Sequence, residues 1–218
     1  MDRNVLRLYL VTDESCLRYA SLLDAVQEAL QAGVTLVQYR EKNGLGREML
    51  QKAVVLRKLC HRYHVPFIVN DRLDIALLSE ADGVHLGQDD LPVAEARKLA
   101  GPDFIIGATA HSVQEALAAQ AAGADYLGCG AVFPTSTKKD TVSLGLDGLQ
   151  AIRNMVHIPV VGIAGITPQN YKQVLAAGAD GIAVVSGILG AENITGAVNK
   201  FLDGPAMAAA VPQKDISR

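Results

Sequence analysis

The sequence has few cysteines, no excess of positive charge and no long apolar run, and each of these absences excludes a class of protein. The three cysteines, Cys16, Cys60 and Cys129, are widely spaced and odd in number. They therefore predict no disulfide framework and fit a reducing compartment. No apolar run reaches the roughly 18 residues that a membrane span needs, and the first residues lack the basic and apolar regions of a signal peptide. We expect a cytoplasmic protein without a membrane segment.

The charge balance excludes a broad nucleic-acid surface. The 218 residues contain 20 lysines and arginines against 23 aspartates and glutamates, which gives a net charge of −3. A surface that binds nucleic acid needs a basic excess, so we expect no such partner and only a local cationic patch. With 50% hydrophobic residues, the chain can bury a sizeable core. The sequence leaves the oligomeric state open, a homo-oligomer included.

Short apolar runs alternate with helical patterns along the chain. Residues 81–83, 122–125 and 177–180 each repeat an Ala/Gly/Asp signal that ends a helix and begins a strand. The expected strands are 5–11, 35–39, 66–69, 83–86, 104–108, 126–129, 159–163 and 181–185. Repeated βα units predict an α/β fold, a single (β/α)8 TIM barrel over residues 1–203, followed by an unpacked tail at 204–218.

An open, doubly wound sheet is the structural alternative to the barrel. That fold would call for a glycine-rich phosphate fingerprint in the turn after the first strand. Residues 11–14 read Val-Thr-Asp-Glu and contain no such fingerprint. The barrel is therefore favoured, and its active face would be the ring of loops at the carboxyl ends of the strands.

Polar residues follow the expected strands where those loops begin. Gln38, Arg40 and Lys42 alternate along an extended segment, which places their side chains on one side. Two of them are cations, so they suit an anionic ligand, although a solvated strand end is the alternative. Asp71 and a carboxylate of the next loop, Asp89 or Asp90, can share Mg²⁺ with substrate phosphates. Helix N-capping is the alternative for these aspartates and is favoured for Asp89.

Three further segments suit phosphate groups. Small residues at 162–166 and 184–187 allow backbone N–H groups to approach an anion closely. In the segment 130–139, two threonines and two lysines offer hydroxyl donors and positive charge, although this segment alone also fits a solvated loop. Together these segments predict room for two small phosphorylated molecules with a metal ion between them. The sequence contains no Ser/His/Asp or Cys/His constellation that we can assign to a nucleophile.

The chain resembles the thiamine phosphate synthase family over about residues 5–202. Six motifs in the same order carry the resemblance: Gln-Tyr-Arg-Glu-Lys at 38–42, Asn-Asp at 70–71, Gly-Val-His-Leu-Gly-Gln-Asp-Asp at 83–90, Pro-Thr-Ser-Thr-Lys-Lys at 134–139, Gly-Ile-Ala-Gly-Ile at 162–166 and Val-Ser at 185–186. Three positions depart from the usual pattern: Tyr39 replaces an aliphatic residue, Thr109 a serine and Ala164 a glycine. None of these departures removes a charged group.

The resemblance implies a transferase of thiamine biosynthesis. Such an enzyme joins 4-amino-2-methyl-5-hydroxymethylpyrimidine diphosphate to 4-methyl-5-(2-hydroxyethyl)thiazole phosphate and releases pyrophosphate in a dissociative, Mg²⁺-assisted displacement. The implied ligands of the pyrimidine diphosphate are Gln38, Arg40, Lys42, Asn70, Thr109 and Lys138, those of the thiazole phosphate are Thr135, Thr137, Gly165, Val185 and Ser186, and those of Mg²⁺ are Asp71 and Asp90. Arg40, Lys42 and Lys138 would be catalytic because they neutralise charge on the leaving group.

Two other functions are compatible with the fold. An isomerase similar to the thiazole tautomerase family would share the barrel and its phosphate loops, but it needs neither the metal carboxylates nor the Thr-x-Thr-Lys segment. A phosphate-binding barrel without synthase activity would not need Lys42, Lys138 and both aspartates together. The residues present therefore favour the synthase.

Overall fold

The computed structural model describes residues 2–135 and 143–202 of the chain. Strands β1 to β8 pair in chain order, each parallel to the next, and β8 closes on β1. The strands are β1 (Leu8–Val11), β2 (Leu36–Tyr39), β3 (Phe67–Asn70), β4 (Gly83–Leu86), β5 (Ile105–Ala110), β6 (Tyr126–Cys129), β7 (Val160–Ile163) and β8 (Gly181–Val184). The predicted barrel is confirmed and the open sheet is excluded. The tail at 204–218 lies outside the described residues, so the domain division stays a prediction.

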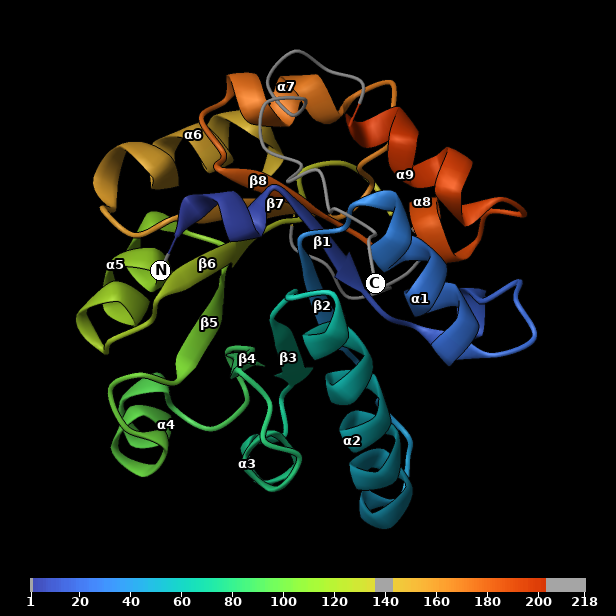
Figure 1. Cartoon of the computed structure of the whole chain (residues 1–218). Helices are drawn as coiled ribbons and strands as arrows, with labels where there is room; N and C mark the ends of the chain where they lie inside the picture. The colour runs from blue at the N-terminus through green and yellow to red at the C-terminus, as the bar shows by residue number, and fades with distance from the viewer. Residues whose placement is uncertain (1, 136–142, 203–218) are drawn as a thin grey trace.

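Helices connect the strands and surround the barrel (Figure 1). They are η1 (Arg3–Leu6), η2 (Glu14–Cys16), α1 (Leu22–Ala32), α2 (Gly46–Arg62), α3 (Leu73–Leu78), α4 (Val93–Ala100), α5 (Val113–Ala121), α6 (Gly145–Met155), α7 (Tyr171–Ala176), α8 (Ser186–Leu189) and α9 (Ile194–Leu202). The side chains of Ser21 and Ser112 cap α1 and α5, because each accepts a backbone N–H of the first turn.

The structure corrects the sequence prediction at three places. The first strand begins at Leu8 and not at residue 5, because residues 3–6 form the short helix η1, whose first turn the Asp2 side chain caps. Strand β5 extends to Ala110, so Thr109 lies within a strand and not in the loop after it. The four-residue helix α8 directly after β8 was not predicted. Its run of four residues is too short to show a helical period.

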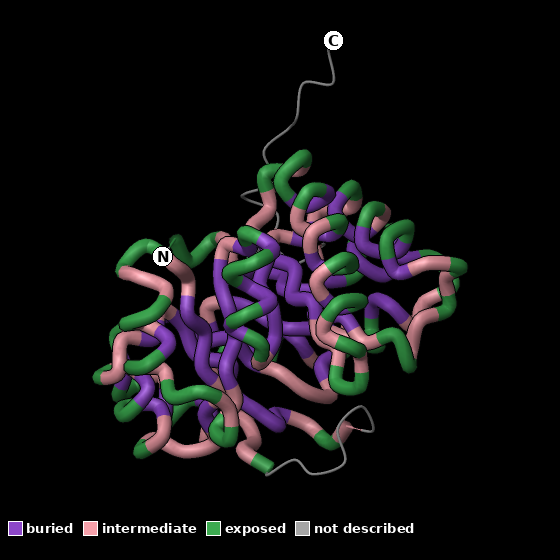
Figure 2. Tube along the Cα trace, turned by 90° about the horizontal axis from the view of Figure 1, so that it is seen from below, coloured by how far each residue is buried: buried purple, intermediate pink, exposed green. Residues whose placement is uncertain are grey.

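Two apolar layers hold the barrel together. Figure 2 shows the buried residues in the interior of the molecule and the exposed ones towards its periphery. The outer layer packs strand residues such as Val37 and Tyr39 against the inner faces of the helices. The inner layer fills the barrel with Tyr9, Leu36 and Tyr126, among others. Tyr39 thus faces away from the barrel interior. Of the helices in the described parts of the chain, none is long and apolar enough to cross a membrane.

Candidate functional site

A cavity of about 550 Å³ opens at the carboxyl ends of the strands. This volume suits small-molecule ligands, for which pockets of roughly 300–1,000 Å³ are usual. Of the predicted site residues, Gln38, Arg40, Lys42, Asn70, Asp71, Asp90, Thr109, Thr135, Gly165, Val185 and Ser186 line this one cavity. Thr137 and Lys138 lie outside the described residues. The structure therefore brings every described candidate to one place, while the role of each stays a prediction.

Arg40 is held in the cavity by the end of β1. Its backbone N–H donates to the Thr12 hydroxyl at 3.0 Å, and its guanidinium donates to the Asp13 carboxylate at 2.7 Å. Burial alone would raise the pKa of Asp13, but hydrogen bonds from Ser15 and the charge of Arg40 outweigh it and lower that pKa. Asp13 therefore stays ionised and fixes the orientation of the cation.

Two carboxylates and a second cation meet beside β3 and β4. The Lys42 ammonium donates to Asp71 at 2.5 Å, and Asp90 accepts the Gly87 N–H at 2.7 Å. Burial, and then the hydrogen bond and charge of Asp71, raise the pKa of Asp90. The two carboxylates are thus close neighbours whose mutual repulsion a cation would relieve. Neither caps a helix, because α3 and α4 begin without a side-chain cap, so the N-capping alternative is wrong for both.

The opposite wall of the cavity is formed by backbone of the β6 and β7 loops. The N–H groups of Val132 and Phe133 donate to carbonyls of Ile163 and Ala164 at 3.0 and 3.2 Å. A side chain at Gly165 would lie 2.5 Å from the Pro134 carbonyl oxygen, so only glycine lets the two loops pack this closely. Thr135, which follows directly, lines the same cavity.

Ala164 has a left-handed backbone conformation, with φ of +78°. This geometry costs a non-glycine residue about 1–2 kcal/mol, while glycine loses only roughly 0.5–1 kcal/mol more conformational entropy than alanine. We therefore expect Ala164→Gly to raise the free energy of unfolding by about 0.5–1 kcal/mol. Denaturant unfolding of the two proteins measures this change, and a less stable variant would show that the strain is relieved in another way.

The floor of the cavity is a row of hydrogen-bonded polar side chains. The Gln38 amide donates to the Tyr9 hydroxyl at 2.6 Å, and the hydroxyls of Tyr9 and Tyr126 lie 2.8 Å apart. On the far side, His85 contacts the Tyr126 hydroxyl through Nδ1 and the Thr109 hydroxyl through Nε2, both at 3.1 Å. His85 is therefore a hydrogen-bonded residue of the barrel interior.

Burial controls the protonation of this row. It raises the pKa of both Tyr9 and Tyr126, so the two phenols keep their protons. It lowers the pKa of His85 from 6.5 to about 4, against a small opposing effect of the Asp71 charge. The His85 ring is therefore neutral at neutral pH.

The neutral histidine predicts a stability that falls in acid. Between pH 6.5 and about 4, the unfolded chain binds a proton at His85 that the folded chain does not, so acidification favours unfolding. The full shift corresponds to about 3 kcal/mol. Denaturant unfolding at pH about 7 and about 4.5 should show a smaller loss for His85→Gln than for the unchanged protein. Equal losses in the two proteins would contradict this assignment.

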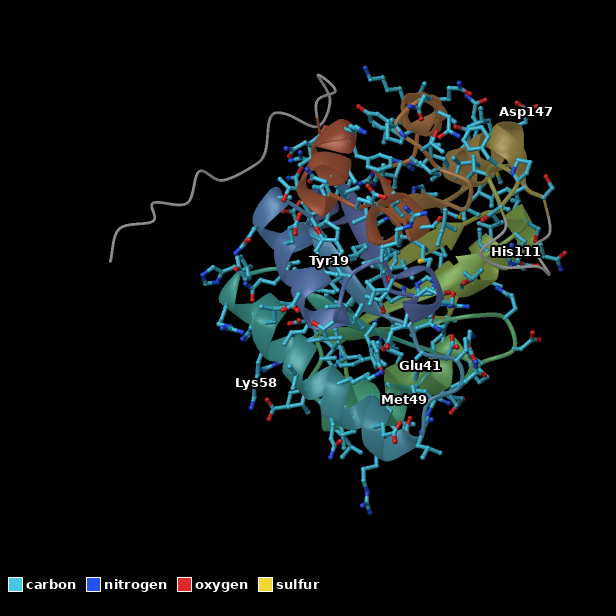
Figure 3. All side chains as sticks on the ribbon, turned by 90° about the vertical axis from the view of Figure 1, so that its right-hand side faces the viewer. Tyr19, Glu41, Met49, Lys58, His111 and Asp147 are labelled. Carbon is cyan, nitrogen blue, oxygen red and sulfur yellow. The ribbon has the colours of Figure 1, made fainter. Side chains whose placement is uncertain are left out.

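Several residues of the site were not predicted. Asp13 had no role in the sequence analysis, although it follows the first strand as Asp71 follows the third. His111 lies beyond the carboxyl end of β5 (Figure 3), and its Nδ1 donates to the Gly130 carbonyl at 2.5 Å. Tyr9 and Tyr126 sit in apolar runs, where an aromatic residue suggests only core packing.

Fold and site together define the class of protein. A parallel barrel whose carboxyl-end mouth gathers cations, carboxylates and glycine turns is typical of enzymes that act on small phosphorylated molecules.

Comparison with known proteins gives the family. The family model of thiamine monophosphate synthase matches residues 8–188. The thiamine-phosphate synthase of Chloroflexus aurantiacus is 51% identical over 196 residues, which cover 89% of this chain and 90% of the relative. That of Clostridium acetobutylicum is 50% identical over 188 residues, covering 86% and 89%. The solved structure of the thiamine phosphate pyrophosphorylase from Pyrococcus furiosus is 45% identical, with a TM-score of 0.85 and coverage of 91% and 95%. The chain therefore belongs to the thiamine monophosphate synthase family.

The predicted family, the transferase class and the predicted synthase activity are confirmed by these similarities. More distant barrels show the fold alone: a 3-hexulose-6-phosphate synthase is 16% identical, with a TM-score of 0.63.

Proposed function

We propose that the chain joins an aminopyrimidine-methyl diphosphate to a thiazole phosphate by a Mg²⁺-assisted displacement. The observation that carries this proposal is the grouping of Arg40, Lys42, Asp71 and Asp90 in one wall of the cavity, opposite the glycine turns. A diphosphate leaving group needs charge neutralisation of this kind. The two walls leave space for two phosphorylated substrates.

The donor set fits Mg²⁺. Hard oxygen ligands on one or two carboxylates, completed by substrate phosphates and water, are usual for this ion. Asp71 and Asp90 are such a pair: burial, and then the neighbouring Asp71, raise the pKa of Asp90, and a bound cation would offset both effects. In the described parts of the chain, no group of three or more His, Cys, Asp or Glu residues could hold a metal by itself. The substrate diphosphate would supply the remaining ligands.

Each residue then has a role that its contacts support. Bound Mg²⁺ would supply charge neutralisation on the departing diphosphate. Arg40, oriented by Asp13, and Lys42 would neutralise further charge on it, and Lys138 is proposed to do the same. The bond between the pyrimidine methylene carbon and the diphosphate oxygen breaks with its electrons on oxygen. The thiazole nitrogen then donates its lone pair to that carbon and has no proton to lose, so no general base is required.

The remaining assignments follow from position. Gln38, Asn70 and Thr109 would hold the pyrimidine, and Thr135 and Gly165 the thiazole phosphate. Val185 and Ser186, which line the same cavity, would complete the phosphate contacts together with Thr137. Helix α8 begins at Ser186, at the position after the eighth strand where barrels commonly bind phosphate.

The test is pyrophosphate release by the purified protein. We expect release only when both substrates and Mg²⁺ are present, and its loss when a chelator is added. Release from the pyrimidine diphosphate alone would indicate a hydrolase, and undiminished coupling after chelation would exclude the metal role.

We also propose a cytoplasmic setting. Cys16, Cys60 and Cys129 are free thiols in the structure, and the last two are buried. Free thiols are typical of reducing compartments. Locating the full-length protein by fractionation of the source cells tests this proposal.

A further inference from the structure

We propose that Tyr126, His85 and Tyr9 form a one-directional hydrogen-bond relay that makes Gln38 an acceptor and Thr109 a donor toward the substrate, and so selects an aminopyrimidine. Tyr126 is thereby a positioning residue, which acts on the ligand through its neighbours, while Tyr9 and His85 also line the cavity. The inference rests on the proposed function, because it concerns the pyrimidine half of that site.

The relay crosses the barrel from β2 to β5 without a break. Gln38 contacts Tyr9 at 2.6 Å, Tyr9 contacts Tyr126 at 2.8 Å, and His85 links Tyr126 to Thr109 with two contacts of 3.1 Å. The interior members are buried: Tyr126 is 0%, Tyr9 2% and His85 9% exposed. Water therefore cannot easily replace a missing partner, and each donor must face an acceptor.

The protein makes room for this relay at two glycines. A side chain at Gly107 would lie 2.2 Å from the Tyr126 ring and 2.5 Å from His85 Nδ1. A side chain at Gly128 would lie 2.9 Å from the His85 ring. The two glycines lie on neighbouring strands, Gly107 opposite Tyr126 and Gly128 opposite Thr109, and together they leave the space that the two rings occupy.

With the Gln38 amide oriented as in the structure, one arrangement of hydrogens satisfies every member. The Gln38 NH₂ group donates to Tyr9, so the Tyr9 hydroxyl is left to donate to Tyr126. The Tyr126 hydroxyl then donates to Nδ1 of the neutral His85, whose Nε2–H donates to the Thr109 oxygen. The reverse direction would give Tyr9 two incoming donors and leave its own hydrogen without an acceptor.

The direction determines what the cavity offers at its two ends. The Gln38 carbonyl oxygen is left to accept, and the Thr109 hydroxyl hydrogen is left to donate; both residues line the cavity. An aminopyrimidine presents the complementary pair, an amino group that donates and a ring nitrogen that accepts. The corresponding 4-oxo pyrimidine presents a carbonyl that accepts and a ring N–H that donates. Binding the 4-oxo form would require every hydrogen bond of the relay to reverse its direction and the Gln38 amide to flip.

The test compares how strongly the protein binds these two pyrimidines. Calorimetry with Mg²⁺ and without thiazole phosphate gives the dissociation constants of the amino and 4-oxo pyrimidine diphosphates. We expect Tyr126→Phe to lower the preference for the amino form by at least about tenfold, because sites that hydrogen-bond a ligand lose discrimination when a partner is removed. Tyr9→Phe should lower the preference for the amino form by a similar factor. The test therefore remains valid if only one of the two variants folds.

Tyr39→Phe is the matched control. Tyr39 is equally buried, but its hydroxyl has no partner and lies on the outer side of the barrel, so its removal should leave the preference within about twofold. A general loosening of the fold would weaken both pyrimidines by one factor and leave their ratio unchanged.

An unchanged ratio in folded Tyr126→Phe or Tyr9→Phe would overturn the relay. The proposed function fails separately, if the unaltered protein releases no pyrophosphate from the two substrates. If no pyrophosphate is released, the relay loses its role in selecting the substrate as well.

Discussion

Asp71→Asn should reduce turnover by at least about a hundredfold at saturating substrates, the range found when a preorganised charge contact to a transition state is removed. Asparagine keeps the size of the side chain and tolerates the left-handed backbone of residue 71, where φ is +62°. The substitution thus removes charge without changing the fold. It takes one of two neighbouring carboxylates from the proposed Mg²⁺ site and the partner from Lys42.

Two measurements separate a metal role from a structural one. Titration with Mn²⁺ in place of Mg²⁺, followed by electron paramagnetic resonance, should show weaker metal binding by Asp71→Asn in the presence of pyrophosphate. Thermal unfolding of the same variant should be nearly unchanged. Asp89→Asn provides the matched control: it removes the same charge from an exposed position in the same loop as Asp90. Equal losses in both variants would assign the effect to the overall potential of the cavity, and not to a metal ligand.

The cationic and acidic walls of the site could be predicted from the sequence because parallel strands bring the residues that follow them to the same end of the barrel. In a barrel, all strands end at the same mouth, so residues that follow the strands directly become neighbours however far apart they lie in the chain. On this ground Asp71 was paired with a carboxylate of the next loop, Asp89 or Asp90, and in the structure Asp90 is close enough for Asp71 to raise its pKa. Arg40 and Lys42 follow from the same rule. The short apolar strands, with helix stop signals before them, were sufficient to place these loops.

The floor of the site could not be predicted in the same way. Tyr9 and Tyr126 lie 117 positions apart, and the Tyr126 ring occupies space that a side chain at Gly107 would fill. A tyrosine in an apolar strand suggests packing, and nothing in its local pattern reveals a hydrogen-bond partner across the barrel. Asp13 was missed for a related reason. Its value lies in holding Arg40, a contact between neighbouring strands whose side-chain reach the sequence does not show.

Gly181→Ala should be among the most destabilising single substitutions in the barrel. Gly181 begins β8, the strand that closes the barrel on β1. A Cβ atom there would lie 1.8 Å from the carbonyl oxygen of Leu6 and 2.5 Å from its carbonyl carbon. These are backbone atoms of a fully buried residue, and the adjoining Ile182 N–H donates to the Arg7 carbonyl at 3.2 Å. No rotamer change can relieve the overlap, so β8 must move away from the segment before β1.

The expected loss is at least about 3 kcal/mol of unfolding free energy, at the upper end of overpacking effects, or a melting temperature lower by roughly 6–12 °C. Gly46→Ala is the control, because a Cβ atom at this first residue of α2 would meet only the Arg72 guanidinium, at an ordinary 3.7 Å. It should leave stability unchanged or raise it by up to about 1 kcal/mol through helix propensity. If Gly181→Ala and Gly46→Ala have the same melting temperature as the unaltered protein, β8 and the segment before β1 are not as closely packed as this register requires.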